Sequence, residues 1–332
     1  LSGAPSLLPD TSGLAYVNPG SASKLQVLLP GESAAPGTST GKTGTPVTTS
    51  SAGDIVRATV NAVDDNWNLV SSVTHTIAIT SSDASATLPP SAALVGGTQR
   101  YSVIFNTAQS NPPGWTATAT DQSGSPLTSG TSASIAIAAA DGQGAIVLTP
   151  ATVVAGSSGN ALAFTFTVPT GGFLDASALT LAIPTGWTAP QVSDTIASGY
   201  VTTSGTCTGT SEALDGLDAR KIVVSMPTAC AAGRTVTITY GADTSPGTKV
   251  TARTNAGTAT FIAQSRSGGG SFVALKTNPS TEVVAGVASK LIFATQPATA
   301  AATTAWPVAV TVQDVNGNTV TTDTPSVTLG IT

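Results

Sequence analysis

Charged side chains are scarce in this sequence: Asp, Glu, Lys and Arg make up 9% of the 332 residues, against about 25% in typical soluble proteins. The net charge is −5, whereas nucleic acid and anionic membranes require clustered Lys and Arg. No apolar run approaches the ~18 residues that a membrane-spanning helix needs. We therefore expect neither a nucleic-acid partner nor a membrane span.

Histidine and cysteine, which carry much of enzyme chemistry, are almost absent. His75 is the only histidine, so neither a Ser-His arrangement nor a histidine-rich metal site is expected, and we interpret His75 as a structural residue. Cys207 and Cys230 are the only cysteines, and they flank a strand-like run at 221–225. We expect them to form a disulfide across neighbouring strands, rather than to remain buried thiols, in an oxidising, extracytoplasmic compartment.

Sustained helical periodicity is also missing, and the sequence is instead rich in Val, Ile and Thr, with 34 Gly and 21 Pro. This composition is typical of strands separated by turns. The hydrophobic fraction of 40% indicates a folded chain rather than a disordered one. Strands are expected at 23–29, 55–63, 73–80, 99–105, 115–120 and 132–138. Short strands at this spacing predict an all-β chain of antiparallel β-sandwiches.

The end of the chain repeats landmarks of its beginning in the same order. The matching segments are 22–27 with 288–293, 64–70 with 314–320, and 76–80 with 328–332. Repetition of this kind indicates a modular array. The first copy continues beyond its third landmark and the second does not, so we expect this chain to be a piece of a longer protein.

Several stretches resemble bacterial immunoglobulin-like repeats. In the first copy they are Asp83-Ala84-Ser85-Ala86-Thr87-Leu88-Pro89, Ala93-Leu94-Val95-Gly96-Gly97-Thr98 and 115–121, and in the last copy 290–297 and 310–318. The middle of the chain, with 183–190 and 261–266, is similar to another sandwich module of large bacterial surface proteins. The resemblance implies tandem immunoglobulin-like β-sandwiches, and such modules serve adhesins, surface layers and enzyme appendages alike.

The repeat and the resemblance together predict the domains. Residues 1–21 form a linker or the closing strand of a preceding unit. Residues 22–139 form an immunoglobulin-like sandwich, in which 33–51 is a long low-complexity surface loop. Residues 140–287 form a second sandwich of a different subtype with the cysteine pair. Residues 288–332 form an incomplete sandwich that repeats the first.

An Asp-x-Asn-x-Asn series occurs in both copies, at Asp64, Asn66 and Asn68 and again at Asp314, Asn316 and Asn318. Alternating oxygen ligands of this kind can bind calcium. We prefer a hairpin turn, in which Asp, Asn and Gly accept positive φ and bond their own backbone. No downstream glutamate completes a calcium loop of the EF-hand type. Calcium is the one cofactor that these positions could hold, and we expect no other.

No other group of residues predicts chemistry. The run 37–43 looks like a phosphate-binding loop, but the spacing of its glycines is one residue short and no helix follows it. Glu212, Asp215 and Asp218 are interpreted as a solvated turn, and the four tryptophans lie singly along the chain. We therefore expect no enzymatic activity.

The leading expectation is an extracellular structural protein of the cell surface. A tandem immunoglobulin-like array would form a stalk, filament, sheath or surface layer through contacts between copies of itself. One alternative is an adhesin that binds carbohydrate or protein on another cell, with 33–51 as its candidate loop. A further alternative is the non-catalytic appendage of a secreted enzyme.

Overall fold

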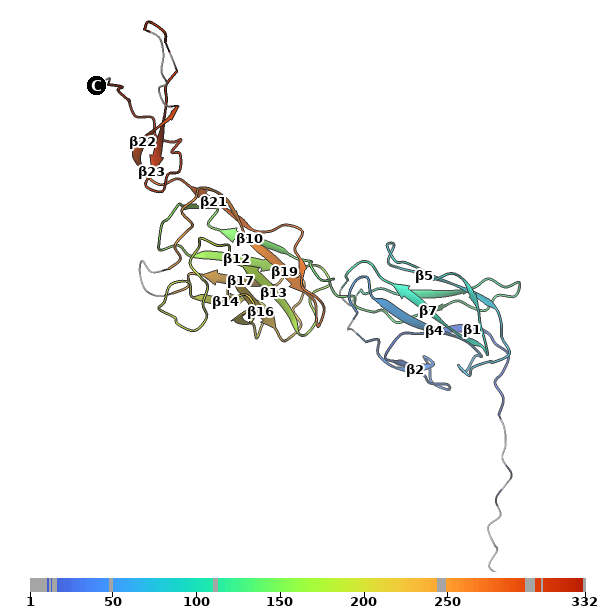
Figure 1. Ribbon diagram of the computed structural model, residues 1–332. Helices are drawn as coiled ribbons and strands as arrows, with labels where there is room; N and C mark the ends of the chain where they lie inside the picture. Colours follow the sequence, from blue (N-terminus) through green and yellow to red (C-terminus); the bar gives the residue numbers. More distant parts are fainter. Residues whose placement is uncertain are drawn as a thin grey trace, which may run out of the picture. The chain divides into compact units, whose positions relative to one another are not determined.

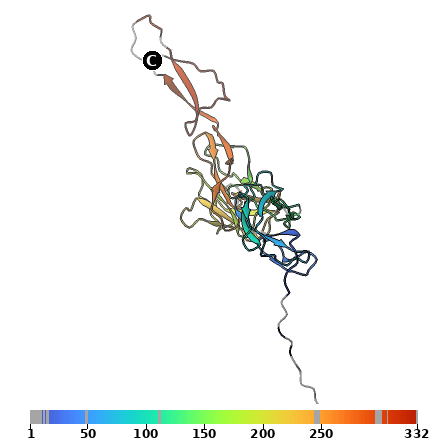
Figure 2. The same ribbon diagram turned by 90° about the vertical axis from the view of Figure 1, so that its right-hand side faces the viewer.

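The computed structural model describes residues 11, 13, 17–47, 50–109, 113–243, 249–295, 302–305 and 307–330. Within these ranges every regular element is a β-strand, which confirms the expected all-β class (Figures 1 and 2). Most of the predicted linker 1–21, Thr48 and Thr49 of the predicted loop, Trp306 and the last two residues of the repeat lie outside the described residues.

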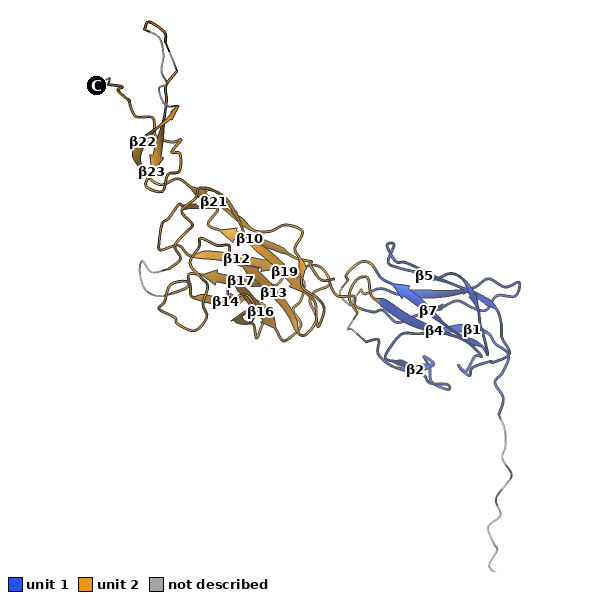
Figure 3. Cartoon of the chain, in the orientation of Figure 1, with its two compact units in different colours: residues 1–47, 55–105, 115–135 blue, residues 48–54, 106–114, 136–332 orange. Residues whose placement is uncertain are grey.

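Contacts divide the chain into two compact units (Figure 3). Unit 1 comprises 1–47, 55–105 and 115–135, and unit 2 comprises 48–54, 106–114 and 136–332. Both units consist of antiparallel sheets, and the pair of β11 (Thr152–Val154) with β21 (Ser280–Val284) is the only parallel one among the named strands of the described chain.

Unit 1 is an immunoglobulin-like sandwich of two antiparallel sheets. One sheet has the order β1 (Lys24–Leu28), β4 (Ile55–Val63), β7 (Thr98–Ile104). The other has the order β6 (Ala92–Ala93), β5 (Thr76–Ser81), β8 (Ala117–Asp121), β9 (Gly130–Thr131). Alternate residues of the strands point inward, as the side-chain period of two requires. Val27, Val60, Ile77 and Val103 are each at most 2% exposed.

The predicted strand 132–138 is not a continuous strand. Ile135 and Ile137 are fully buried, as their alternation indicates, but each forms an isolated bridge, Ile135 with Trp115 and Ile137 with Gln109. The ladder is interrupted because the segment changes partner along its length, and the Ala138 amide donates to Ser50. The inward-outward pattern was therefore right and the regular pairing was wrong.

The predicted loop 33–51 is also more ordered than expected. Its described part begins with a hairpin of β2 (Glu32–Ala34) and β3 (Lys42–Gly44). Lys42 Nζ lies 2.8 Å from Glu32 Oε1 across the hairpin. Gln26 of β1 donates its side-chain amide to the carbonyl of Gly41 at 2.7 Å, and this bond is buried. The hairpin thus packs on unit 1.

Unit 2 has a larger core and more strands. One sheet has the order β10 (Ala145–Thr149), β12 (Leu162–Thr167), β17 (Thr235–Tyr240), β14 (Val201–Gly205). A second has the order β15 (Ser211–Leu214), β16 (Lys221–Met226), β13 (Ser177–Ala182), β19 (Ile262–Arg266), β20 (Val273–Ala274). Phe261 stacks edge-on against Phe164 at 5.0 Å and against Trp187 at 5.4 Å. The three rings belong to one cluster of buried side chains that forms the core of unit 2.

A short third sheet closes one end of unit 2, with the order β11, β21, β18 (Gly257–Thr260). Beyond it the chain enters the hairpin of β22 (Ala288–Thr295) and β23 (Ala309–Asp314), drawn in red in Figure 2. Strands β11 and β21 end, and strand β18 begins, at the same end of this sheet, and the hairpin follows β21 there.

The hairpin reproduces the start of unit 1 in register. In unit 1 Lys24 pairs with Val63, and in the hairpin Lys290 pairs with Gln313, the equivalent positions of the repeat. The third repeated segment does not follow: 76–80 lies in β5, whereas 328–330 forms no strand. The hairpin also lacks the cover of a second sheet among its described residues, so Phe293 is 42% exposed where the equivalent Val27 is 2% exposed.

Candidate functional site

The first Asp-Asn turn follows β4 and is hydrogen-bonded to the segment that precedes β1. Asp64 is 4% exposed. Its Oδ1 accepts the backbone amides of Asn66 and Asn68, both at 2.9 Å. Its Oδ2 accepts the backbone amide of Gly20 at 2.9 Å and the side-chain amide of Asn68 at 3.0 Å. Gly20 precedes β1, so one carboxylate holds both the turn and the incoming chain.

The second turn repeats this arrangement. Asp314 is fully buried, and its Oδ1 accepts the backbone amide of Asn318 at 2.8 Å. Its Oδ2 accepts the Gly286 amide and the Asn318 side chain, both at 2.8 Å. Gly286 stands before β22 as Gly20 stands before β1. The same arrangement of a buried carboxylate, a turn and a preceding glycine therefore occurs twice in the chain.

The fourth position of the turn has positive φ in both copies, with 68° at Trp67 and 90° at Gly317. Glycine adopts this conformation freely, whereas other residues pay a cost in conformational energy. In unit 1 packing offsets that cost: the Trp67 ring lies against Gly41 on one side. Lys24 Nζ lies 3.7 Å from the centroid of the ring.

The electrostatics of both turns favour an ionised carboxylate satisfied by the protein itself. The side-chain hydrogen bond from Asn68 lowers the pKa of Asp64, with smaller contributions from backbone amides. Burial alone would raise the pKa of Asp314, but hydrogen bonds from Asn318, Gly286 and Asn316 lower it to about 2. N–H donors surround these oxygens where a cation would need free lone pairs. These hydrogen bonds are the ones that the turn interpretation expects, and the calcium interpretation stays a prediction.

The second turn also contacts the sandwich that precedes it, which the sequence did not predict. Asn316 donates its side-chain amide to the carbonyl of Ala155 at 3.3 Å. Asn318 donates to the carbonyl of Thr254 at 2.8 Å and accepts the Ala256 amide at 2.8 Å. Ala155 follows β11 and Ala256 precedes β18. The partners are backbone atoms in unremarkable loops, so no pattern of residue types marks them.

Cys207 and Cys230 form a disulfide in unit 2, with both residues buried. Cys207 follows β14 and Cys230 precedes β17, which are neighbouring strands of one sheet. The segment between the cysteines holds two strands, β15 and β16, whereas the sequence predicted only the second. These two strands pair in the second sheet of unit 2. The chain therefore crosses to that sheet and returns between the two cysteines, and the disulfide joins the two ends of this segment.

His75 pairs with a buried carboxylate. Its Nδ1 lies 2.6 Å from Asp121 Oδ2, and the Asp121 side chain is fully buried. Asp121 also accepts the backbone amides of Ser123 and Leu127, each at 2.9 Å. Burial would raise the pKa of Asp121, but the hydrogen bonds from Leu127, His75 and Ser123 lower it to about 2. The sequence missed this partner because it lies on β8, far along the chain.

The acidic residues at 212–218 each have a hydrogen-bond partner, but Glu212 lies in β15 and not in the expected turn. Asp218 accepts the Arg220 amide at 2.9 Å. Glu212 accepts the Thr203 hydroxyl at 2.6 Å. Asp215 lies 2.9 Å from Lys221 Nζ, and that hydrogen bond lowers the pKa of Asp215. The arrangement supports a turn rather than a pair of facing catalytic carboxylates.

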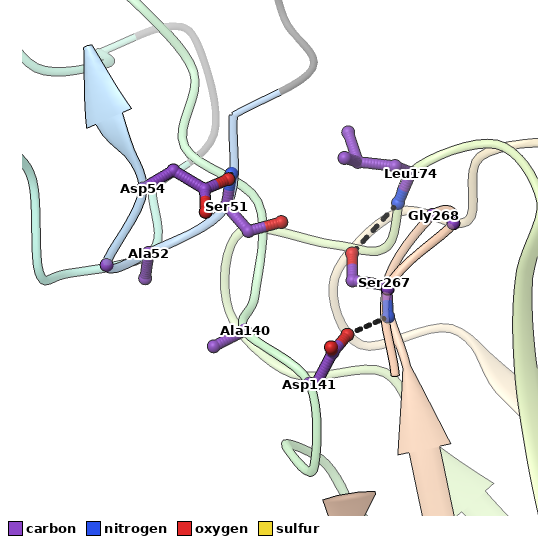
Figure 4. A pocket seen from close by; sticks show the side chains of 11 residues that line it. Ser51, Ala52, Asp54, Ala140, Asp141, Leu174, Ser267 and Gly268 are labelled. Atoms are coloured by element: carbon purple, nitrogen blue, oxygen red, sulfur yellow. Dashed lines mark hydrogen bonds between the residues drawn. The ribbon is translucent and has the colours of Figure 1, made fainter. Parts of the chain in front are cut away.

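A hollow of about 490 Å³ in unit 2 is lined by small and polar residues, including the glycine-rich loop 268–270 (Figure 4). Asp141 accepts the Ser267 and Ser271 amides, both at 2.8 Å. Asp54 accepts the Ser51 amide at 2.7 Å. No lining residue is a histidine or a cysteine, and no three or more His, Cys, Asp and Glu side chains of the described residues are grouped so that they could hold a metal ion.

Comparison with known proteins gives fold neighbours and no family. The sequence matches no protein-family model and no curated protein. An uncharacterized protein from Nocardia farcinica with an immunoglobulin-like fold is 16% identical, with 42% of this chain and 96% of that chain covered and a TM-score of 0.26. InvD of Yersinia pseudotuberculosis is 15% identical, with 82% and 68% covered and a TM-score of 0.25.

The type II cohesin dyad of the scaffoldin ScaA from Acetivibrio cellulolyticus is 8% identical, with 79% and 97% covered and a TM-score of 0.23. At these TM-scores the likeness assigns neither a family nor a function to this chain. No helix long and apolar enough to cross a bilayer occurs in the described part of the chain.

Proposed function

We propose that this chain is an extracellular structural protein, part of a tandem array of immunoglobulin-like sandwiches that builds a stalk, filament, sheath or surface layer from copies of itself. The observation that carries the proposal is that the first strands of two modules, with the glycine and the turn bonded to them, recur in the chain. Two copies share strand register, an Asp-Asn turn and a fastened glycine. In a tandem array each repeat contacts only its neighbours, and stability is a sum of repeat and nearest-neighbour terms, so a module start that recurs with the same hydrogen bonds supports an array built by repetition.

The proposed modules are 22–139, 140–287 and 288–332. In the second copy the turn bonds both to its own entering glycine and to the loops of the module before it. A joint with several hydrogen bonds restricts hinge motion more than a bare linker does. This property supports a structural role over a flexible tether.

An extracellular, cell-surface location accords with the disulfide and with the low charge. Disulfides persist in oxidising compartments and are rare in the cytosol. The Cys207–Cys230 bridge joins the segments next to two neighbouring strands of one sheet of unit 2, β14 and β17.

The features that would favour an adhesin are weak in this structure. The candidate binding loop begins as the hairpin β2–β3 and packs on its own module. Trp67, the aromatic residue beside it, has its ring covered by Gly41 and Lys24. A carbohydrate platform needs an open aromatic face.

Negative-stain electron microscopy of the native material tests the proposal. We expect long, regular polymers, sheets or stalks with a repeat along their length. Dispersed single molecules that bind a glycan array as monomers would contradict the structural role and support an adhesin. Dispersed molecules attached to a catalytic domain would instead support the enzyme appendage.

A further inference from the structure

We propose that Gly20 and the turn 64–68 form a docking surface on the first module, and that its occupant is a β-sandwich module of the unit 2 type lying immediately upstream in the same polypeptide. The inference rests on the proposed array and names the partner of each module. The equivalent surface of the second copy, Gly286 and the turn 314–318, carries such a module in this structure.

The same polar atoms are present on the first turn. Asn66 and Asn68 stand where Asn316 and Asn318 stand, with the same backbone bonds: the Asp64 amide donates to Asn68 at 3.0 Å, as the Asp314 amide does to Asn318. The Asn68 side-chain amide is anchored on Asp64. Its Oδ1 therefore has a fixed position, the position from which Asn318 Oδ1 accepts the Ala256 amide.

The chain that leads into the first module supplies a second, independent observation. Val17 stands three positions before Gly20, as Val283 of β21 stands three positions before Gly286. Val283 is 1% exposed in the core of unit 2, whereas Val17 is 94% exposed. A large apolar side chain in this register is what the last strand of a preceding sandwich requires.

Trp67 does not obstruct this surface. The Trp67 ring, which has no counterpart at Gly317, is directed onto Gly41 of the β2–β3 hairpin and lies under Lys24. A shallow hollow of about 540 Å³ remains beside Gly20, lined by 18–22 and 70–73. Asn66 is exposed, and its side chain has no hydrogen-bond partner among the described residues.

The test is a fusion in which residues 1–19 of the full chain are replaced by a second copy of 140–285. This copy brings its own buried core and its own disulfide. The exposed Ile262 is changed to Val in the upstream copy, so that mass spectrometry distinguishes the two peptides that contain Ala256. Hydrogen exchange at the two Ala256 amides is then compared within one molecule.

We expect the upstream Ala256 amide to be protected to the same degree as the downstream one. Asn66→Ala should speed exchange at the upstream junction about five-fold, the effect of losing one neutral hydrogen bond, and Asn316→Ala should do the same downstream. Asn66→Ala in the unfused chain is the matched control, and it should leave thermal unfolding unchanged.

Free exchange of the upstream Ala256 amide, in a fusion whose two sandwiches are both folded, would overturn the docking surface. Protection that Asn66→Ala and Asn68→Ala leave unchanged would overturn it as well. Both results compare amides within the same unassembled fusion protein. They are therefore independent of whether native material forms polymers.

Discussion

Trp67 adopts φ of 68° in a turn where the second copy has a glycine, so at the residue scale the first module must stabilise a conformation that the sequence disfavours. The stabilising contacts come from the hairpin β2–β3. Gly41 has φ of 73° and lies directly against the indole, where a Cβ would overlap the ring. The hairpin, the tryptophan and the turn therefore depend on one another.

Gly41→Ala should destabilise unit 1 by about 3 kcal/mol, because it combines left-handed backbone with an overpacked contact. Gly37→Ala in the same hairpin is the matched control, because its φ is 80° and nothing lies within 4 Å of its Cβ position. The control should cost only about 1 kcal/mol. Urea unfolding of the full chain, followed through the unit 1 transition, measures both; equal losses would contradict the packing role of Trp67.

Acid should destabilise unit 1 through Asp121. The folded-state pKa of about 2 lies below the ordinary value of 3.8, so ionised Asp121 stabilises the fold above pH ~4, and this contribution is lost as the pH falls toward 2. Asp121→Asn should therefore flatten the dependence of the unit 1 melting temperature on pH between 5 and 2. A variant that keeps the full wild-type slope would show that other carboxylates govern acid unfolding.

The candidate site was predictable in part at this scale. The Asp-Asn series identified the turn in both copies because local hydrogen bonding depends on residue type. It did not identify Gly20 and Gly286 as partners of Asp64 and Asp314, because a backbone amide carries no sequence signature. The docking atoms at Ala155 escaped prediction for the same reason.

At the scale of elements, period-two alternation located five of the six strands expected in the first module: β1, β4, β5, β7 and β8. The predicted strand 55–63 has the same limits as β4, and 99–105 differs from β7 by one residue at each end. Segment 132–138 kept its inward residues but not its ladder, because pairing depends on partners that alternation does not name. Low complexity concealed β2 and β3, which are held by the Gln26 and Glu32 side chains rather than by apolar faces.

Removing the disulfide should act on unit 2 alone. The two cysteines are 23 residues apart in sequence, and closing a loop of this length stabilises a fold by about 3 kcal/mol in the chain-entropy account. Cys207→Ser/Cys230→Ser should lower the stability of unit 2 by about that amount and leave the transition of unit 1 in place. Differential scanning calorimetry of the two proteins shows both transitions, and a shift of the unit 1 transition would contradict this division.

At the scale of the whole molecule, the repeated turn links one module to the next. The sequence predicted a modular array from its repeat, and it could not predict how modules meet, because the joint is made by loop backbone at the edge of the sheet β11–β21–β18. Asp314 is fully buried although its hairpin is open. The contacts with the loops at Ala155 and 254–256 thus bury the turn, although no second sheet covers the hairpin among its described residues.

Hydrogen exchange of the Gly286 and Ala256 amides in the wild-type chain tests the central claim, that each module is clasped at its entrance and docked on the module before it. Both amides donate to side chains of the second turn, and we predict exchange at least about ten-fold slower than that of a solvated loop amide. Exchange of both amides at the rate of an unstructured peptide would show that the clasp is absent in solution and would contradict the account.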